Sequence, residues 1–364
     1  MKSELFHLLR IALGNESDLS VPEGADWPAL VALATEQGVA GVAYDGLQKC
    51  YEANPKLVLP FDRDQKTVKY DWFGSVLSME IAYEEHHQTL TEICKMLSDY
   101  GIKVLLMKGY GLSLLYPISN HRPSGDIDIY CFDDFDRANS VIRAQGIKVD
   151  NSHHKHSVCH LGGQMVELHH SFLNSFAHRS TAKIERILED IVSQEEMIPV
   201  EGFWIPSANF NALYLLRHMA EHFASTGCTL RHLLDWALFC QRFGADVTRE
   251  WYQGIIREVG MSRFLWITNR MCVKYLGLPE ESFGFAGEYR DSRCDDDLVD
   301  RAMGDILSRE FGEKAPAGFW PGLAFKFRRW RANGWKHDIV FSESRLISFM
   351  TQTWSHLLKP ATMK

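Results

Sequence analysis

Two aspartates separated by a single residue, Asp126 and Asp128, lie in the stretch HRPSGDIDIY at residues 121–130. The apolar Ile127 and Ile129 alternate with them, which is the period-two pattern of a β-strand with one buried face. Both carboxylates then project from the same face, where their charges repel each other unless a cation lies between them. Carboxylate oxygens are the ligands that Mg²⁺ and Mn²⁺ prefer, so the pair predicts a divalent-metal site.

The alternative interpretation of the aspartate pair is a solvated strand face whose acids are neutralised by Arg122 or Lys155. A third acid favours the metal interpretation. The segment MVELHH also alternates, and Glu167 shares one face of it with Met165 and His169. We therefore expect Glu167 to lie beside the aspartate pair and to complete the carboxylate site.

The segment before the aspartate pair has the composition of a phosphate-binding turn. LLMKGYG places Lys108 and Gly109 after a short apolar strand and before a short helix. A glycine at such a position lets backbone N–H groups approach a phosphate. Three acids beside a turn of this kind indicate a two-metal phosphoryl-transfer site. In such a site one cation activates an acceptor hydroxyl, and the other holds a triphosphate and stabilises the leaving pyrophosphate.

The strand and helix patterns around these residues predict an α+β protein, with a small mixed β-sheet core flanked by helical regions. Strand patterns are concentrated in the middle of the chain, at 103–107, 125–132 and 163–172, with two more candidates in IKVD and HHKHSVCHL. Amphipathic helical patterns precede and follow them. The predicted regions are an N-terminal helical region at 1–100, a core at 101–205 and a C-terminal helical domain at 206–364.

The composition is that of an ordinary folded protein, with 46% hydrophobic and 24% charged residues among 364. A formal net charge of −8 argues against a protein held to nucleic acid by bulk charge. The eight cysteines include no C-x-x-C spacing, and several stand in apolar runs, as reduced core thiols do. Neither a signal peptide nor a membrane span is expected, and these features together predict a cytoplasmic protein.

A histidine-rich stretch, HHKHSVCH at 153–160, has three interpretations. On a strand, His154, His156 and His160 share a face and invite a zinc site. Lys155 or His156 could instead contact a substrate phosphate. The simplest interpretation is a solvated or hydrogen-bonded strand, because zinc needs ligands that converge, often from a second element.

A second histidine motif runs from His218 to His222 and matches H-x-x-E-H, the inverted zinc-peptidase pattern. Histidines four residues apart share one face of a helix. The sequence offers no clear third ligand, however. The alternative is a set of polar residues on a helix packed near the acidic site, where they hydrogen-bond to an acceptor or a base.

The stretch FKFRRWRANGWKH at 325–337 places lysines and arginines among aromatic residues. Such a patch can bind RNA or an acidic surface. A helix with a basic, solvated face is the simpler interpretation in an acidic chain. If the acceptor were a tRNA, this stretch is where contact would be expected.

Taken together, the motifs resemble the nucleotidyltransferases of the DNA polymerase beta superfamily. More specifically, they resemble an uncharacterised bacterial branch often labelled nucleotidyltransferase family 5. The residues that carry the resemblance are Lys108-Gly109, Tyr116-Pro117, the Arg-Pro-Ser-Gly-Asp-Ile-Asp run at 122–128 and Glu167-Leu168-His169. The likeness covers about residues 25 to 245, including downstream helices in which His218, His222, Arg231 and Asp235 follow in the expected order.

The resemblance implies transfer of a nucleoside monophosphate from an NTP such as ATP to an acceptor hydroxyl, with Asp126, Asp128 and Glu167 binding Mg²⁺ or Mn²⁺. Arg122 would neutralise a phosphate or orient Asp126. Tyr110 stands where the wider superfamily has a small residue, which makes Lys108 the more attractive phosphate partner. Residues expected to bind the nucleotide are Lys108, Gly109, Gly111, Arg122, Lys155 and His156; those expected to support the site from behind are His169, His218 and His222.

Two other functions fit parts of the sequence. A D-x-D glycosyltransferase also uses a metal to hold a nucleotide diphosphate, but it normally has a longer α/β region before the motif. Here one strand clearly precedes it. A regulator that binds nucleotides without turnover could use the same scaffold. Within the nucleotidyltransferase hypothesis the acceptor stays open among a small molecule, a saccharide, a protein side chain and a tRNA end.

Overall fold

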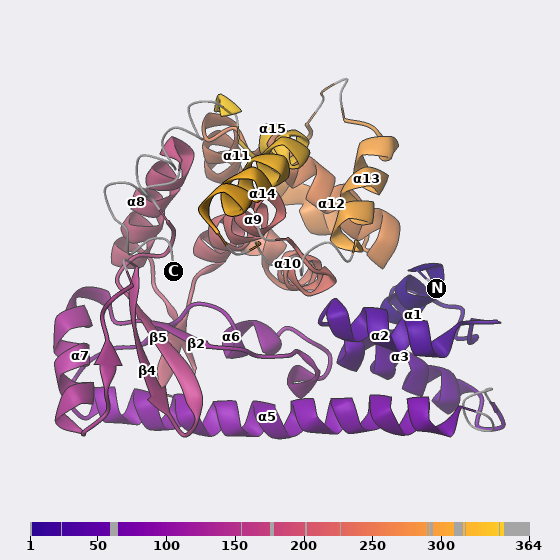
Figure 1. Cartoon of the computed structure of the whole chain (residues 1–364), viewed down its shortest axis with the longest axis horizontal. Coiled ribbons are helices and arrows are strands. Elements are labelled where there is room, and N and C mark those ends of the chain that lie inside the picture. Colours follow the sequence, from indigo (N-terminus) through magenta and orange to yellow (C-terminus); the bar gives the residue numbers. More distant parts are fainter. Residues whose placement is uncertain are drawn as a thin grey trace.

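The computed structural model describes most of the chain: residues 2–22, 24–58, 65–153, 155–174, 178–200, 202–225, 227–289, 291, 294–308, 316, 318–341 and 343–345. Figure 1 shows the long helix α5 (Lys66–Ser98) running along the base of the molecule. The β-sheet stands over one half of α5, and the N-terminal helices lie over the other half (Figure 1). The C-terminal helices form a layer above both.

The N-terminal helices begin and end at the signals that the sequence provides. They are α1 (Lys2–Leu13), α2 (Trp27–Glu36) and α3 (Ala40–Ala53). The carboxylate of Asp26 accepts the backbone N–H of Ala29 and caps α2, with Pro28 in the first turn. Gly38, at φ +67°, separates α2 from α3.

One mixed sheet of seven strands holds the centre of the fold, in the order β3-β4-β5-β2-β1-β7-β6. The prediction of an α+β protein with a small mixed sheet between helical regions is confirmed. The strands are β1 (Leu105–Leu106), β2 (Ile127–Tyr130), β3 (Val149–Asp150), β4 (His156–Leu161), β5 (Gln164–His169), β6 (Ile198–Val200) and β7 (Phe203–Ile205).

The two faces of the sheet have opposite chemistry. Ile127 and Ile129 on β2 are fully buried, and they form a core with Leu168 on β5 and with apolar residues of α5 and of α7 (Phe135–Ala144). Asp128 and Glu167 occupy the alternate positions and therefore project from the other face. The period-two pattern thus correctly predicts which side chains of β2 enter the core.

The region between residues 173 and 205 contains elements that the sequence analysis missed. They are helix α8 (Arg179–Gln194) and the antiparallel pair of β6 and β7. β7 pairs in parallel with β1 and so extends the sheet beyond it. Strands of three residues are too short to show an alternating pattern. Helix α8, by contrast, carried a readable signal, because Ile184, Leu188 and Ile191 are buried at helical spacing.

The C-terminal region is helical, as predicted. Its α-helices are α9 (Ala208–Ala224), α10 (Leu230–Phe243), α11 (Arg249–Glu258), α12 (Ser262–Leu276), α13 (Asp296–Ile306), α14 (Phe319–Ala332) and α15 (Gly334–Val340). The division of the chain at residues 100 and 205 stays a prediction. Seven of the eight cysteines are buried, and Cys294 is half-buried. No helix in the described part of the chain is both long and apolar enough to cross a bilayer.

Candidate active site

The three acids singled out in the sequence come together on one face of the sheet. β2 and β5 pair in parallel, and their register places Asp128 directly opposite Glu167. Asp126 immediately precedes β2. One carboxylate oxygen from each of Asp126, Asp128 and Glu167 lies within 4.8 Å of the other two. This grouping is compatible with shared coordination of a cation by oxygen ligands.

Two basic side chains already contact the acids. The Lys108 Nζ lies 3.1 Å from Oδ2 of Asp128. The His169 Nε2 lies 2.9 Å from Oδ1 of Asp128 and 3.3 Å from Oε2 of Glu167. His169, expected to act from behind the site, therefore holds two of the three carboxylates directly. Lys108, expected to bind phosphate, is paired with Asp128 in this structure.

The acids differ in their electrostatic environments. Burial raises the pKa of Asp126, and repulsion from Asp128 raises it further. Burial also acts on Asp128, but Lys108 and the hydrogen bond with His169 hold the pKa of Asp128 below its usual range. For Lys108, burial is opposed by Tyr214 and by the carboxylates of the cluster, and its pKa is raised overall. Asp128 is thus held in its charged form more firmly than Asp126.

The turn after β1 shapes the entrance to this cluster. Gly109 adopts φ +66° and ψ −115°, a conformation open to glycine, and precedes the four-residue helix α6 (Tyr110–Ser113). The backbone N–H of Met107 donates to the carbonyl of Asp128 at 3.2 Å, which fixes the turn against β2. Lys108 is therefore directed at the acids by the backbone on both sides of it.

A cavity of about 260 Å³ lies between the acidic face of the sheet and helices α9 and α10. The two aspartates and Lys108 stand on its sheet side, and histidines stand on its helical side. The lining residues are Lys108, Gly109, Leu112, Arg122, Gly125, Asp126, Asp128, Leu215, His218, Met219, His222, Arg231, His232 and Asp235. The site is therefore a pocket shared by the sheet and the C-terminal helices.

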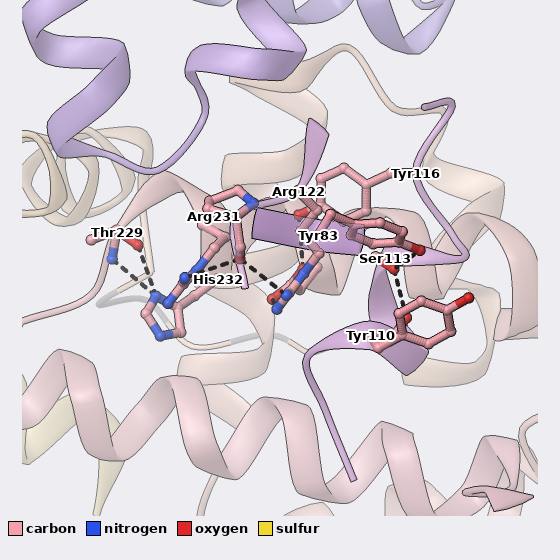
Figure 2. A network of polar contacts seen from close by, with 10 residues as sticks. Tyr83, Tyr110, Ser113, Tyr116, Arg122, Thr229, Arg231 and His232 are labelled. Carbon is pink, nitrogen blue, oxygen red and sulfur yellow. Dashed lines mark hydrogen bonds and ion pairs between the residues drawn. The ribbon is translucent and has the colours of Figure 1, made fainter. Parts of the chain in front are cut away.

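Arg122 lines this cavity but differs from its predicted role. Its guanidinium donates to Asp235 through Nε at 2.7 Å and Nη2 at 2.9 Å, and the Tyr116 hydroxyl donates to the same carboxylate at 2.8 Å. Figure 2 shows Arg122 and Tyr116 within this polar network. The expectation that Arg122 orients Asp126 is therefore replaced by a bidentate pair with Asp235, which is 113 residues later in the chain.

Gly111 does not contribute to the cavity. A Cβ at this position would lie 3.2 Å from Ile205, so the glycine allows α6 to pack closely on β7. Tyr110, which stands where the wider superfamily has a small residue, packs on α5. Its ring stacks on Tyr83 and on His87, with centroid distances of 5.2 and 4.8 Å. Gly111 thus has a packing role that the sequence analysis did not predict, and its role in nucleotide binding stays a prediction.

The histidine-rich strand lies at the edge of the acidic cluster. His156 has Nδ1 3.6 Å from Oε2 of Glu167, and burial lowers the pKa of His156 to about 4. His160 is four residues away on the same strand, roughly 13 Å along it, so the two cannot share one metal ion. Lys155 immediately precedes β4 and does not line the cavity. His154 lies outside the described residues.

On the helical side, the structure supplies a residue that the sequence analysis missed. His218 and His222 lie on α9, and His232 from the first turn of α10 joins them. One ring nitrogen from each lies within 4.8 Å of the other two. The only sequence signal for His232 is its place three residues after Thr229, with which it forms a capping box.

The basic stretch near residue 330 is only partly a solvated face. Lys336 is buried, and its Nζ pairs with Oδ2 of Asp305 at 2.7 Å, so this lysine is not available to an RNA phosphate. The guanidinium of Arg328 lies 5.5 Å from the ring of Phe325. The side chains of Lys326 and Arg329 lie outside the described part of the structure.

Comparison with known protein families gives one match. A family model described as an uncharacterised nucleotidyltransferase matches residues 23–277, well over half of the chain. Searches of curated proteins and of solved structures gave no match. The matched range contains the carboxylate cluster, the turn at Gly109 and the histidines of α9 and α10. The chain therefore belongs to this family of uncharacterised nucleotidyltransferases.

Proposed function

We propose that the protein is a metal-dependent enzyme that transfers a nucleoside monophosphate from an NTP to an acceptor hydroxyl and releases pyrophosphate. The observation that carries the proposal is the parallel register of β2 and β5, which sets Asp128 opposite Glu167 with Asp126 beside them. The two aspartates border a cavity whose opposite wall comes from α9 and α10, where an acceptor would enter.

The donor set suits Mg²⁺ or Mn²⁺. Asp126, Asp128 and Glu167 would hold the metal through carboxylate oxygens. Their combined negative charge exceeds what the ammonium of Lys108 and the shared imidazole of His169 can neutralise. When bound, the metal would neutralise phosphate charge and lower the pKa of the acceptor hydroxyl.

The chain's own residues would divide the remaining tasks. Lys108 would move from Asp128 to a phosphate of the NTP once the metal neutralises the acids. Arg231 lines the same cavity, and its Nη1 donates to the carbonyl of Pro123 at 3.4 Å, a long hydrogen bond that its guanidinium could exchange for one to a phosphate. Glu167, oriented by His169, would help to take the proton from the acceptor hydroxyl.

The topology is less compatible with a D-x-D glycosyltransferase. In the described part of the chain, β1 is the single strand that precedes the D-x-D strand. A nucleotide-sugar fold normally places a longer α/β region there. The carboxylate cluster binds the metal and does not select the nucleotide or the acceptor. The following experiment identifies both.

The test is transfer of label from each α-labelled NTP in turn, with Mg²⁺ and a cell extract as the source of acceptor. The wild type is compared with Asp126→Asn/Asp128→Asn. A matched control is Asp133→Asn/Asp136→Asn, which changes two exposed aspartates shortly after β2. Label transferred by the wild type and the control, but not by the active-site variant, supports the proposal. Binding of NTP without transfer in any extract would instead indicate a nucleotide-sensing protein.

A further inference from the structure

Three histidines form a compact group on the helical wall of the cavity. His218 and His222 are one turn apart on α9, and His232 faces them from the first turn of α10. Their ring centroids lie 4.5 Å (His218–His222), 4.9 Å (His222–His232) and 5.8 Å (His218–His232) apart. One ring nitrogen of each lies within 4.8 Å of the other two. Two separate helices therefore bring three imidazoles to one point at the cavity.

The Nδ1 of His232 contacts Thr229, the residue that precedes α10. Nδ1 accepts the backbone N–H of Thr229 at 3.2 Å and lies 3.0 Å from the hydroxyl of Thr229, and Figure 2 shows the two contacts. Ligation of a metal through Nε2 would require the ring proton to move to Nδ1, which would then donate it to Thr229 Oγ1. A hydrogen bond of that kind fixes the ring orientation of a ligand histidine.

We propose that His218, His222 and His232 bind one zinc ion, with a fourth coordination position open to the cavity. Three imidazole nitrogens suit zinc, whereas the carboxylates on the opposite wall suit Mg²⁺. Zn–N bonds of about 2.0–2.1 Å place tetrahedral nitrogens about 3.4 Å apart, so small side-chain rotations close the group around the ion. The proposal does not depend on nucleotidyl transfer, because it concerns different ligands and a different metal.

The charges around the histidines determine what takes the fourth position. Lys108 and Arg231 line the same cavity, and both contribute positive potential at the histidines. A further positive charge there is favourable only with an anionic ligand. The fourth position therefore binds an anionic oxygen, such as that of a phosphate or a carboxylate, in preference to a neutral group.

The same geometry excludes a peptidase role for the H-x-x-E-H motif. In such a motif the glutamate acts as general base beside the metal. Here Oε1 of Glu221 accepts from Nε of the fully buried Arg217 at 3.1 Å. Glu221 is thus neutralised by its own helix neighbour, and the zinc site stands without a catalytic base of that type.

The experiment measures zinc directly on the untagged full-length chain, without nucleotide. The protein is incubated with Zn²⁺ and excess Mg²⁺, gel-filtered and analysed for metal. About one zinc per chain is expected for the wild type and for Asp126→Asn/Asp128→Asn. His232→Ala should weaken zinc binding at least about 100-fold, since even the outer partners of a metal site are worth roughly 10–100-fold. His160→Ala, at an exposed strand position, is the matched control and should retain zinc.

Two further measurements keep the test valid if His232→Ala folds poorly. Thr229→Val keeps the shape of the residue that orients His232, and it should weaken zinc binding about 10–100-fold. Co²⁺ bound to the wild type should show the visible absorption of a tetrahedral site. The proposal is overturned if the wild type retains no zinc or if folded His232→Ala binds it unchanged. Loss of zinc in the aspartate variant would also overturn it, by placing the ion at the carboxylates.

Discussion

Asp128 and Asp235 are both buried carboxylates that line the same cavity, yet they are neutralised in different ways. Asp235 accepts two hydrogen bonds from the guanidinium of Arg122 and one from the hydroxyl of Tyr116. Asp128 is paired with Lys108 and His169 but also lies beside two other acids. The first group is closed, with one positive charge for one negative charge. The second has three carboxylates for one ammonium and one shared imidazole.

This difference separates a structural ion pair from a site that can bind a cation. A bidentate pair with matched charges has no capacity left for a ligand, and removing either partner leaves a buried charge unpaired. A cluster with surplus negative charge is stabilised when a divalent ion binds. Arg122 and the two aspartates of the D-x-D motif are close together in the sequence. Arg122 nevertheless belongs to the balanced ion pair with Asp235, whereas the aspartates belong to the cluster with surplus negative charge.

The largest expected effect is on stability, at Asp235. Asp235→Asn should lower the free energy of unfolding by about 3–5 kcal/mol, because it leaves the buried guanidinium of Arg122 without its counter-charge. Urea unfolding measures the change. Asp297→Asn, at an exposed position in α13, should stay within about 0.5 kcal/mol of the wild type. A replacement of the whole pair, Arg122→Met/Asp235→Leu, should regain much of the loss; a neutral single variant would contradict the structural role.

The next effect is on activity, at Asp128. Asp128→Asn should lower the rate of label transfer about 100- to 1000-fold, the range seen when one preorganised charge-stabilising group is removed. Its unfolding free energy should fall less than that of Asp235→Asn, because Lys108 keeps Asp126 nearby as a counter-charge. Parallel urea curves for the two variants make the comparison. Equal destabilisation of both would mean that Asp128 is a structural acid as well.

A smaller effect follows from the surplus charge itself. Mg²⁺ or Mn²⁺ should raise the stability of the wild type by about 2.7 kcal/mol when the free ion exceeds its Kd roughly 100-fold. Asp126→Asn/Asp128→Asn should show no such gain. Thermal unfolding with MgCl₂, against NaCl at matched ionic strength, separates binding from screening. Equal stabilisation of both proteins would remove the case for a metal at these acids.

The local part of this comparison could be read from the sequence. Alternation in GDIDIY is enough to place Ile127 and Ile129 in the core and the aspartates on the opposite face. Asp26 and Gly38 likewise mark helix ends through backbone chemistry that needs no tertiary information. The alternation in MVELHH likewise singled out Glu167, although its position opposite Asp128 depends on the pairing of β2 with β5.

The remainder depends on contacts between distant segments. Arg122 stands beside the D-x-D run in the sequence, so a role at the metal was a natural prediction. Its partner Asp235 enters from α10, and only packing of that helix on the cavity reveals the pair. His232 reaches the cavity by the same route. Gly111 lies two residues after Gly109, yet it contacts Ile205 of β7, a strand too short to predict.

A third buried acid, Asp45, is paired with a histidine, His121. Unlike the arginine that pairs with Asp235, a histidine can lose its charge as the pH rises. His121, next to Arg122 in the chain, has Nδ1 2.6 Å from Asp45 and Nε2 2.9 Å from Glu80. Burial opposes the charge of His121, but these two hydrogen bonds raise its pKa above the usual value. Such a group stabilises the fold fully below its unfolded pKa of about 6.5, and the contribution is lost as pH rises through the folded pKa.

His121→Gln should therefore cost about 1–3 kcal/mol of unfolding free energy at pH 6, and less at pH 9, because the wild type loses the contribution of its imidazolium as the pH rises. Urea unfolding at the two pH values measures the difference. His160→Gln, at an exposed position of β4, should show the same small effect at both. A cost for His121→Gln that does not change with pH would mean that His121 acts as a neutral hydrogen-bonding group. The contribution of His121 to the free energy of unfolding would then be as independent of pH as that of the Arg122–Asp235 pair.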